Sequence, residues 1–361
     1  MALDMLVRDV TSGIRTVTIT CENGNDYDGR MGLRIASIFV ILVGSFLGAV
    51  FPIYAGRHKG VQVPEWSFFI AKYFGSGVIV ATAFIHLLAP AHEALTSPCL
   101  NGPITSYSWV EGIVLMTIFS LFFVELMVMR YVRFEAHDHH HDKHDVESHP
   151  GKVDSDSSVD AIEPRMSKNG HAPGEDHLGH RRNHVDNEDA PSTVSAEDFA
   201  AQMTAIFILE FGIIFHSVFI GLTLAVTGSD FNTLFVVLVF HQTFEGLGLG
   251  SRLAVTPWPS SKRWTPYIFA IGYSVSTPIA IGVGLGVRKI YPPESNTTLI
   301  VNGVFDSISA GILIYTGLVE LMAHEFMFSN VMRKASGRTV LSAFGLMCAG
   351  AALMALLGKW A

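Results

Sequence analysis

The chain of 361 residues is apolar and weakly charged: 49% of its residues are hydrophobic, 16% are charged, and the formal net charge is −8. Together with a mean hydropathy of +0.38, this composition excludes an ordinary soluble domain and indicates a protein that crosses a lipid bilayer. We therefore expect a lipid environment and no nucleic-acid partner.

Eight apolar runs are long enough to span a bilayer, which takes about 20 helical residues. Their interiors are rich in Gly and Ala, which lets helices approach closely. We expect an all-α fold, a polytopic membrane protein whose eight transmembrane helices form a bundle with an inverted repeat. The predicted spans are residues 33–55, 66–89, 107–130, 200–227, 232–254, 266–288, 299–325 and 339–358.

Polar segments divide these spans into four regions. Residues 1–32 form a predicted extracellular tail, and the apolar run that follows is too long for the core of a secretory signal. Residues 33–130 contain the first three spans, and residues 131–199 form a long polar loop. Residues 200–361 contain the other five spans.

The distribution of Lys and Arg predicts the orientation, because these residues mark short cytoplasmic connections. They cluster after spans 1 and 3, between spans 5 and 6, and between spans 7 and 8. The main exception lies between spans 6 and 7, where Asn296 begins a glycosylation sequon. We therefore expect a plasma-membrane protein with both termini outside the cell and the 131–199 loop in the cytoplasm.

Several spans contain ionisable residues, which are costly inside a bilayer and indicate a functional path. The tripeptide Ala-His-Glu occurs at 91–93 and again at 323–325, near spans that cross in opposite directions. An inverted repeat would place the two copies at opposite mouths of a path, although ordinary hydrogen bonding between helices is the alternative. The candidate groups that relay a metal ion are His86, His92, Glu93, Glu210, Glu320 and His324.

The 131–199 loop contains ten of the sixteen histidines. Residues 135–198 have few aromatic residues and many polar ones, so we expect them to be disordered. A His-rich tract is typical of weak metal binding, and a purely solvating acidic linker is the alternative. The predicted regulatory histidines are His137, His139, His140, His141 and His144.

Spans 4 and 5 contain the strongest metal-binding pattern. His241 and Glu245 are four residues apart and therefore share one helix face, where they form half of a zinc-type ligand shell. His216 in the preceding span adds a third ligand if the two helices are antiparallel. A buried His–Glu hydrogen bond that only fixes helix packing is the alternative. With their polar neighbours, the candidate metal residues are His216, Ser217, His241, Gln242 and Glu245.

The three cysteines form no CxxC motif, so they do not predict a thiolate metal site or a redox motif. Cys21 and Cys99 both lie on the predicted outer side, and a disulfide between them is left open. Cys348 lies inside span 8, where we expect it to pack against other helices.

The segments 216–221 and 241–250 resemble the signature of ZIP (Zrt/Irt-like) metal transporters, and segments 27–34, 81–88, 97–100 and 309–315 are similar to the fungal and plant branch. The resemblance covers nearly the whole chain. It implies eight spans, outside termini, a His-rich cytoplasmic loop, and a bundle of spans 1, 4, 5 and 6 packed against spans 2, 3, 7 and 8. It also implies a primary metal site at His216, His241 and Glu245.

The chain departs from the family pattern at four positions. Many members have an acidic residue where this chain has Ile220. Members with two metal ions have Asn, Asp and Glu where Ser217, Gln242 and Thr277 stand here. Because all three positions are neutral, we expect a site for a single ion.

The expected function is secondary transport of Zn²⁺, or of Fe²⁺ or Mn²⁺, into the cytoplasm by alternating access. The ion would be a substrate, so we expect no cofactor and no enzymatic activity, and the sequence allows a homodimer. An intramembrane zinc hydrolase and a metal-sensing receptor are the alternatives. The hydrolase motif His-Glu-x-x-His is broken in both Ala-His-Glu segments, by Thr96 and by Phe328.

Overall fold

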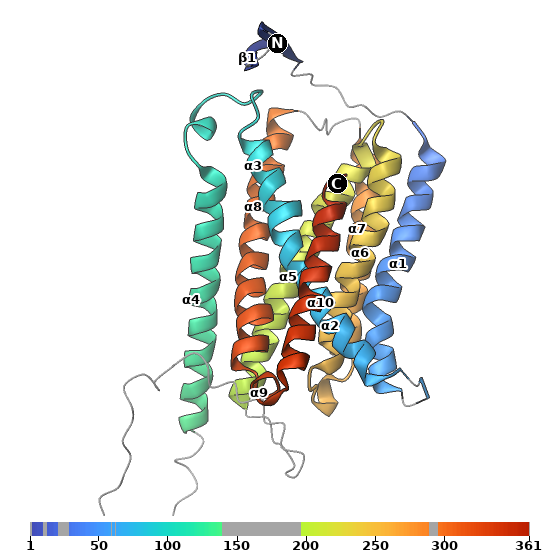
Figure 1. Cartoon of the computed structure of the whole chain (residues 1–361), viewed down its shortest axis with the longest axis vertical. Helices are drawn as coiled ribbons and strands as arrows, with labels where there is room; N and C mark the ends of the chain where they lie inside the picture. The colour runs from blue at the N-terminus through green and yellow to red at the C-terminus, as the bar shows by residue number, and fades with distance from the viewer. Residues whose placement is uncertain are drawn as a thin grey trace, which may run out of the picture.

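The computed structural model describes residues 2–9, 13–20, 29–58, 60–61, 63–138, 196–288 and 295–360. Within these ranges, eight helical crossings are long and apolar enough to span a membrane, and Figure 1 shows them side by side in one bundle. The prediction of eight transmembrane helices is therefore confirmed. The crossings are Met31–Arg57, Glu65–Leu95, Trp109–Val128, Gln202–Val226, Phe231–Val255, Ser260–Val287, Asn296–Lys334 and Gly337–Leu357.

Six crossings are built around one long α-helix each, whereas the second and seventh are composite. In the second, the π-helical segment η1 (Thr82–Leu88) joins α2 (Glu65–Ala81) to α3 (Ala89–Leu95). In the seventh, the π-helical segment η4 (Gly317–Phe328) joins α8 (Asn296–Thr316) to α9 (Asn330–Lys334). The other long helices are α1 (Met31–Arg57), α4 (Trp109–Asp138), α5 (Ala196–Val226), α6 (Phe231–Val255), α7 (Thr265–Val287) and α10 (Gly337–Leu357), and two short 3₁₀ turns are η2 (Pro103–Thr105) and η3 (Ser260–Lys262).

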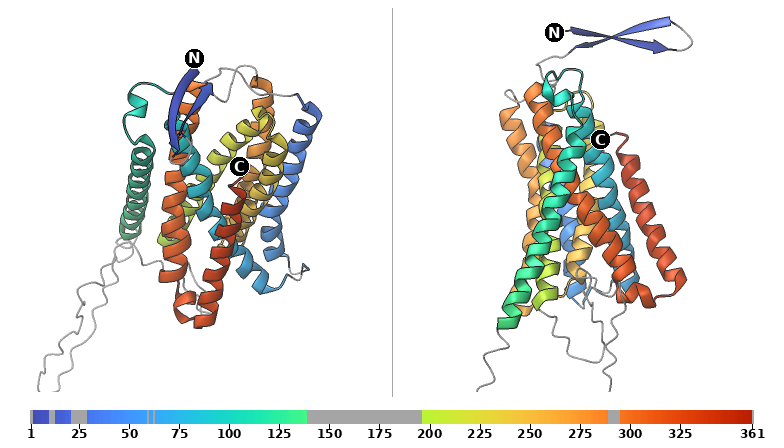
Figure 2. Two further views of the ribbon diagram at one scale, coloured as in Figure 1. Left: turned by 45° about the horizontal axis from the view of Figure 1, so that its top comes forward. Right: turned by 90° about the vertical axis from the view of Figure 1, so that its left-hand side faces the viewer.

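A β-hairpin precedes the first helix. Strands β1 (Ala2–Asp9) and β2 (Gly13–Thr20) pair antiparallel, with Ala2 opposite Thr20. The sequence analysis predicted only a polar tail here, although the alternating Ile, Thr and Val residues of β2 favour a strand. The hairpin stands beyond one end of the bundle (Figure 2), so the all-α prediction holds for the membrane part. We call this the hairpin end and the opposite end, where α4 stops, the loop end.

The helices pack as two groups. In the first bundle, α1 packs against α6 and α7, and α5 packs against α7. In the second bundle, α2 packs against α10, and α8 packs against η1, α3 and α4. This division matches the one that the family resemblance implies. The two bundles touch mainly where α2 meets α6 and where α5 meets α8.

Two glycines bring the bundles into very close contact. A Cβ atom added to Gly75 of α2 would lie 2.2 Å from the Cα of Gly248 on α6. No other residue fits there without moving a backbone. Small residues allow this kind of crossing in a membrane, where close van der Waals packing replaces the hydrophobic effect as the driving force.

A buried arginine ties α1 to the end of α5 and the start of α6 at the hairpin end. Arg34 of α1 is fully buried and donates to the carbonyls of Leu224 (3.1 Å), Ala225 (2.9 Å) and Thr227 (2.5 Å). These carbonyls end α5 and have no intrahelical partner. The guanidinium carbon also lies 4.5 Å from the ring centre of Phe231 on α6. Arg34 therefore fixes the turn between α5 and α6 to α1.

Large apolar side chains cover the outside of the bundle, including Phe39, Phe119 and Leu341, as expected for a surface in lipid. The prediction that Cys348 packs inside the bundle is wrong: it is exposed and free, because α10 contacts α2 through one face only. Cys99 is disulfide-bonded. Cys21 lies outside the described residues, so the Cys21–Cys99 pairing that the sequence left open is not described.

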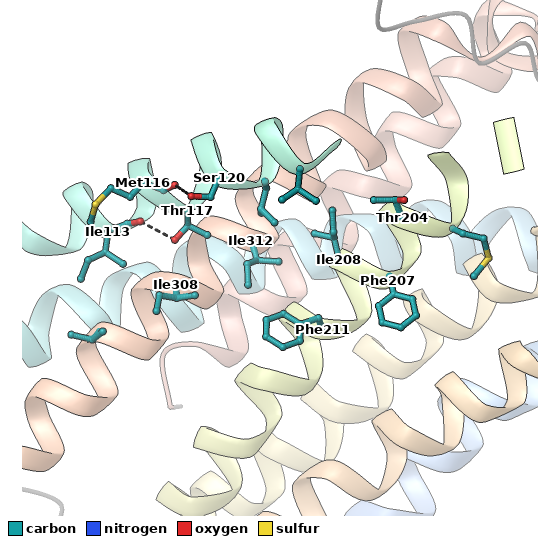
Figure 3. A pocket seen from close by; sticks show the side chains of 14 residues that line it. Ile113, Met116, Thr117, Ser120, Thr204, Phe207, Ile208, Phe211, Ile308 and Ile312 are labelled. Atoms are coloured by element: carbon teal, nitrogen blue, oxygen red, sulfur yellow. Dashed lines mark hydrogen bonds between the residues drawn. The ribbon is translucent and has the colours of Figure 1, made fainter. Parts of the chain in front are cut away.

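A cavity of about 910 Å³ lies among α4, α5 and α8. Figure 3 shows its apolar lining, with the hydroxyls of Thr117 and Ser120 turned to the carbonyls of Ile113 and Met116 on their own helix. These hydroxyls are already bonded, and none of the described residues that line the cavity is ionisable. It offers nothing to a metal ion.

The predicted His-rich loop lies largely outside the described residues. Helix α4 continues to Asp138, eight residues past the predicted end of span 3, so His137 belongs to its last turn. The other four predicted regulatory histidines, His139, His140, His141 and His144, are not described.

Candidate metal site

Three metal-ligand side chains meet in the interior of the bundle, where α5 and α6 lie antiparallel. The Nε2 atoms of His216 and His241 are 3.4 Å apart, and the Nε2 of His241 is 3.4 Å from Oε1 of Glu245. One ligand atom from each residue lies within 4.8 Å of the other two. No more than 2% of any of the three residues is exposed. The structure thus brings together the three residues that the sequence selected as primary ligands.

The spacing suits a zinc ion. Ligand atoms held about 2.0–2.1 Å from zinc at the corners of a tetrahedron are about 3.4 Å from one another. Both contacts of His241 have this length, so small side-chain shifts suffice to place all three ligands around one ion. The fourth corner is left for water or for another protein group.

The polar atoms of the site lack other partners. Among the described residues, both carboxylate oxygens of Glu245 and the Nδ1 atoms of His216 and His241 have no hydrogen bond. Thr82 lies beside Glu245, but its hydroxyl donates to the Val78 carbonyl at 3.1 Å. A buried polar group without a partner costs about 1–3 kcal/mol, and a charged one costs more. A bound dication would remove most of this cost.

The neighbouring polar residues form a neutral hydrogen-bonded group. The Gln242 amide nitrogen donates to Thr277 Oγ1 and, at 3.5 Å, to Ser217 Oγ. The Tyr273 hydroxyl donates to the Gln242 backbone carbonyl at 2.6 Å. Ser217 and Gln242, both candidate metal residues, are therefore turned toward each other and toward Thr277.

Comparison of the sequence with known proteins identifies one family. A family model described as ZIP Zinc transporter matches residues 31–358. The chain belongs to the ZIP zinc transporter family. Zinc-regulated transporter 2 of Saccharomyces cerevisiae is 44% identical over 95% of this chain and 97% of its own length. Zinc-regulated transporter 1 of Schizosaccharomyces pombe is 39% identical over 96% and 90%, and zinc transporter 3 of Arabidopsis thaliana is 32% identical over 94% and 89%.

The recognition from sequence motifs is thereby confirmed, and ZIP proteins are transporters rather than enzymes. The two alternatives, a zinc hydrolase and a metal-sensing receptor, are not favoured.

One predicted relay residue lies beside the triad of this ZIP protein. His86 of η1 is buried, and its ring centre is 4.8 Å from that of His241. Its Nε2 lies 3.0 Å from the Met354 carbonyl on α10. When Nε2 donates this hydrogen bond, the lone pair of Nδ1 stays available to a metal ion.

Two predicted relay residues lie near the hairpin end. His92 and Glu93 are exposed, and Nδ1 of His92 is 3.2 Å from Oε1 of Glu111 on α4. The sequence analysis did not select Glu111. A cavity of about 210 Å³ adjoins this pair.

The other relay residues lie between the triad and the loop end. Glu210 is buried, six residues before His216 on α5, and neither carboxylate oxygen has a hydrogen-bond partner among the described residues. Glu320 and His324 of η4 are also buried. The two Ala-His-Glu segments therefore lie toward opposite ends of the bundle, as the inverted repeat predicts.

Two cations that the sequence did not single out contact the carboxylates of η4. Arg252 Nη1 lies 3.0 Å from Glu325 Oε1, and Arg252 Nη2 lies 3.9 Å from Glu320 Oε2. Lys72 Nζ lies 3.3 Å from Glu325 Oε2. Arg252 was counted among the basic residues between spans 5 and 6. However, α6 continues to Val255, and the Arg252 side chain is only 16% exposed. Its spacing of seven residues from Glu245, two helical turns on the same face, was the available signal.

Proposed function

We propose that this ZIP protein imports Zn²⁺ into the cytoplasm by alternating access, with His216, His241 and Glu245 as the central binding site. One observation supports this most directly: three ligand-type side chains converge in the membrane interior, and their polar atoms contact one another but few other groups. A permanent structural site would need a more complete shell. Three ligands and an open position suit an ion that must also leave.

We place the hairpin end outside the cell and the loop end in the cytoplasm. Both termini lie toward the hairpin end in Figure 1, as an even number of crossings requires. The Lys and Arg residues of the short connections favour the same orientation. A plasma-membrane location follows from an uptake role, because the substrate then comes from outside the cell.

The relay residues define a route from outside to inside. A hydrated ion is attracted by Glu93 and by the His92–Glu111 pair, and it loses water as it reaches the triad. His86 stands beside the triad and supplies a fourth donor during entry. Glu210 offers the next carboxylate toward the cytoplasm, and Glu320 and His324 follow.

The neutral group of Ser217, Gln242 and Thr277 limits the site to one tightly held ion. Its hydrogen bonds are made internally, so these residues orient the helices around the triad more than they bind metal. Two imidazoles and a carboxylate accept Fe²⁺ and Mn²⁺ as well as Zn²⁺. The regulatory role of the loop histidines and a homodimer stay predictions from the sequence.

Zinc flux into proteoliposomes tests the function. The purified protein should accumulate Zn²⁺ inside vesicles, with Fe²⁺ and Mn²⁺ added as competitors to rank the metals. His241→Ala should abolish the flux, whereas Ser217→Ala, which removes one weak hydrogen bond, should reduce it only modestly. Zinc binding by the wild-type protein without accumulation would support a receptor and refute the proposal.

A further inference from the structure

A charge cluster joins the two bundles at the loop end. Arg252 belongs to α6 of the first bundle, whereas Glu320 and Glu325 belong to η4 of the second bundle. The side chains are 16%, 5% and 11% exposed, respectively. Lys72 of α2 also contacts Glu325, but both of these residues belong to the second bundle.

We propose that Arg252 is the latch of the cytoplasmic mouth, and that a departing metal ion opens this mouth by displacing Arg252 from Glu320 and Glu325. The proposal rests on the function proposed above, since that function places Glu320 on the exit route, and it adds Glu325, which contacts the same arginine. It assigns Arg252 a positioning role, because the guanidinium never contacts the ion.

The packing of α2 against α6 explains why the latch lies at this level of the bundle. Gly75 and Gly248 bring the backbones of α2 and α6 into contact. Lys72 lies three residues from Gly75 and Arg252 lies four residues from Gly248, each about one turn toward the loop end. The crossing leaves no room for a side chain, so the next groups toward the cytoplasm are these two cations and the carboxylates of η4.

The charges make the exchange possible at low cost. In the closed arrangement, two carboxylates face two cations. A Zn²⁺ ion carries the charge of the two cations, so the carboxylates stay compensated when it replaces Arg252 and Lys72. The side chains of these two cations are already 16% and 28% exposed, and they turn to the cytoplasm when released. Of these two contacts, only that of Arg252 connects the two bundles, because the contact of Lys72 lies within one of them.

Two cysteine crosslinks distinguish the role of the Arg252–Glu325 contact from that of the Lys72–Glu325 contact. In a Cys348→Ser background, one variant combines Arg252→Cys with Glu325→Cys, and its matched control combines Lys72→Cys with Glu325→Cys. A short, reducible bifunctional thiol reagent links each pair in proteoliposomes, and mass spectrometry verifies the link. Linking positions 252 and 325 should stop zinc uptake until a mild reductant restores it. Linking positions 72 and 325 should change uptake less than twofold relative to the same variant before it is linked.

Full uptake with positions 252 and 325 linked would refute the latch, and so would equal inhibition by the two links. Recovery on reduction shows that the inhibited protein was folded. If the Cys348→Ser protein itself accumulates no zinc, the proposed function fails instead, which this design distinguishes from failure of the latch.

A second measurement uses the charge of Arg252. Arg252→Gln removes a charged hydrogen bond that favours the state closed to the cytoplasm, so fewer molecules face outward. The zinc concentration for half-maximal uptake should rise roughly tenfold, whereas Arg252→Lys, which keeps the cation, should raise it much less. A value for Arg252→Gln within twofold of the wild type would overturn the proposal.

Discussion

Glu245→Gln separates the metal-binding role of the triad from its role in the fold. The substitution keeps the shape of the side chain and removes its charge. Glu245 is fully buried, and neither of its oxygens accepts a hydrogen bond among the described residues, although Oε1 lies 3.4 Å from Nε2 of His241. Because a buried charge without hydrogen bonds is costly, the metal-free protein should gain stability when the charge is lost. Loss of one ligand should weaken zinc binding at least 100-fold, because loss of a group that only orients a ligand already costs about 10–100-fold.

Thermal unfolding and zinc uptake measure the two effects on the same purified protein. The wild type should gain about 2.7 kcal/mol of stability at a zinc concentration 100 times its dissociation constant, and the Glu245→Gln variant should gain almost nothing. Uptake by the variant should fall to background although its metal-free melting temperature is higher.

The matched control is Glu210→Gln, which also removes a buried carboxylate without a partner but lies outside the triad. It should keep the zinc-dependent stabilisation and slow the uptake. If zinc stabilises Glu245→Gln as much as the wild type, or if that variant transports normally, the triad is not the binding site.

Three other predictions concern the rest of the molecule. Ile220→Asp adds a carboxylate one turn from His216, so zinc should bind more tightly in uptake competition while the maximal rate falls; unchanged affinity and rate would mean that residue 220 does not face the ion. Arg34→Ala leaves three carbonyls at the end of α5 without their donor and should destabilise the protein by about 2–4 kcal/mol, measured by thermal unfolding in detergent, and an unchanged melting temperature would contradict this. Deletion of residues 137–184 should leave uptake at low zinc mostly intact and keep the protein at the cell surface at high zinc, as surface labelling would show; loss of transport at low zinc would place the loop in the pathway.

Length and hydropathy were sufficient to predict the eight crossings, because a bilayer fixes how many apolar residues each helix needs. The triad was equally accessible. His241 and Glu245 lie on one face by helical spacing alone, and only the antiparallel neighbour had to be assumed to add His216. These properties are local, and a sequence shows local properties directly.

The direction in which Arg252 points was not accessible in the same way. A cation near a helix end is most often a marker of the cytoplasmic surface, and only the contacts of this one with Glu320 and Glu325 of η4 show that it points inward. The hairpin of β1 and β2 was not predicted, because its strands are short alternating segments, whereas the predicted elements were long apolar runs. The π-helical segments were missed because the composition of η1 and η4 does not distinguish them from α-helix.

The π-helical segments allow side chains of spans 2 and 7 to change the direction in which they point. A π turn holds about one residue more than an α turn, so its return to α geometry, or its movement along the helix, rotates the following side chains by one residue, about 100°. His86 lies in η1, and Glu320 and His324 lie in η4. Each of these side chains can therefore move into or out of the proposed metal route while its helix stays continuous and its backbone stays hydrogen-bonded within the membrane.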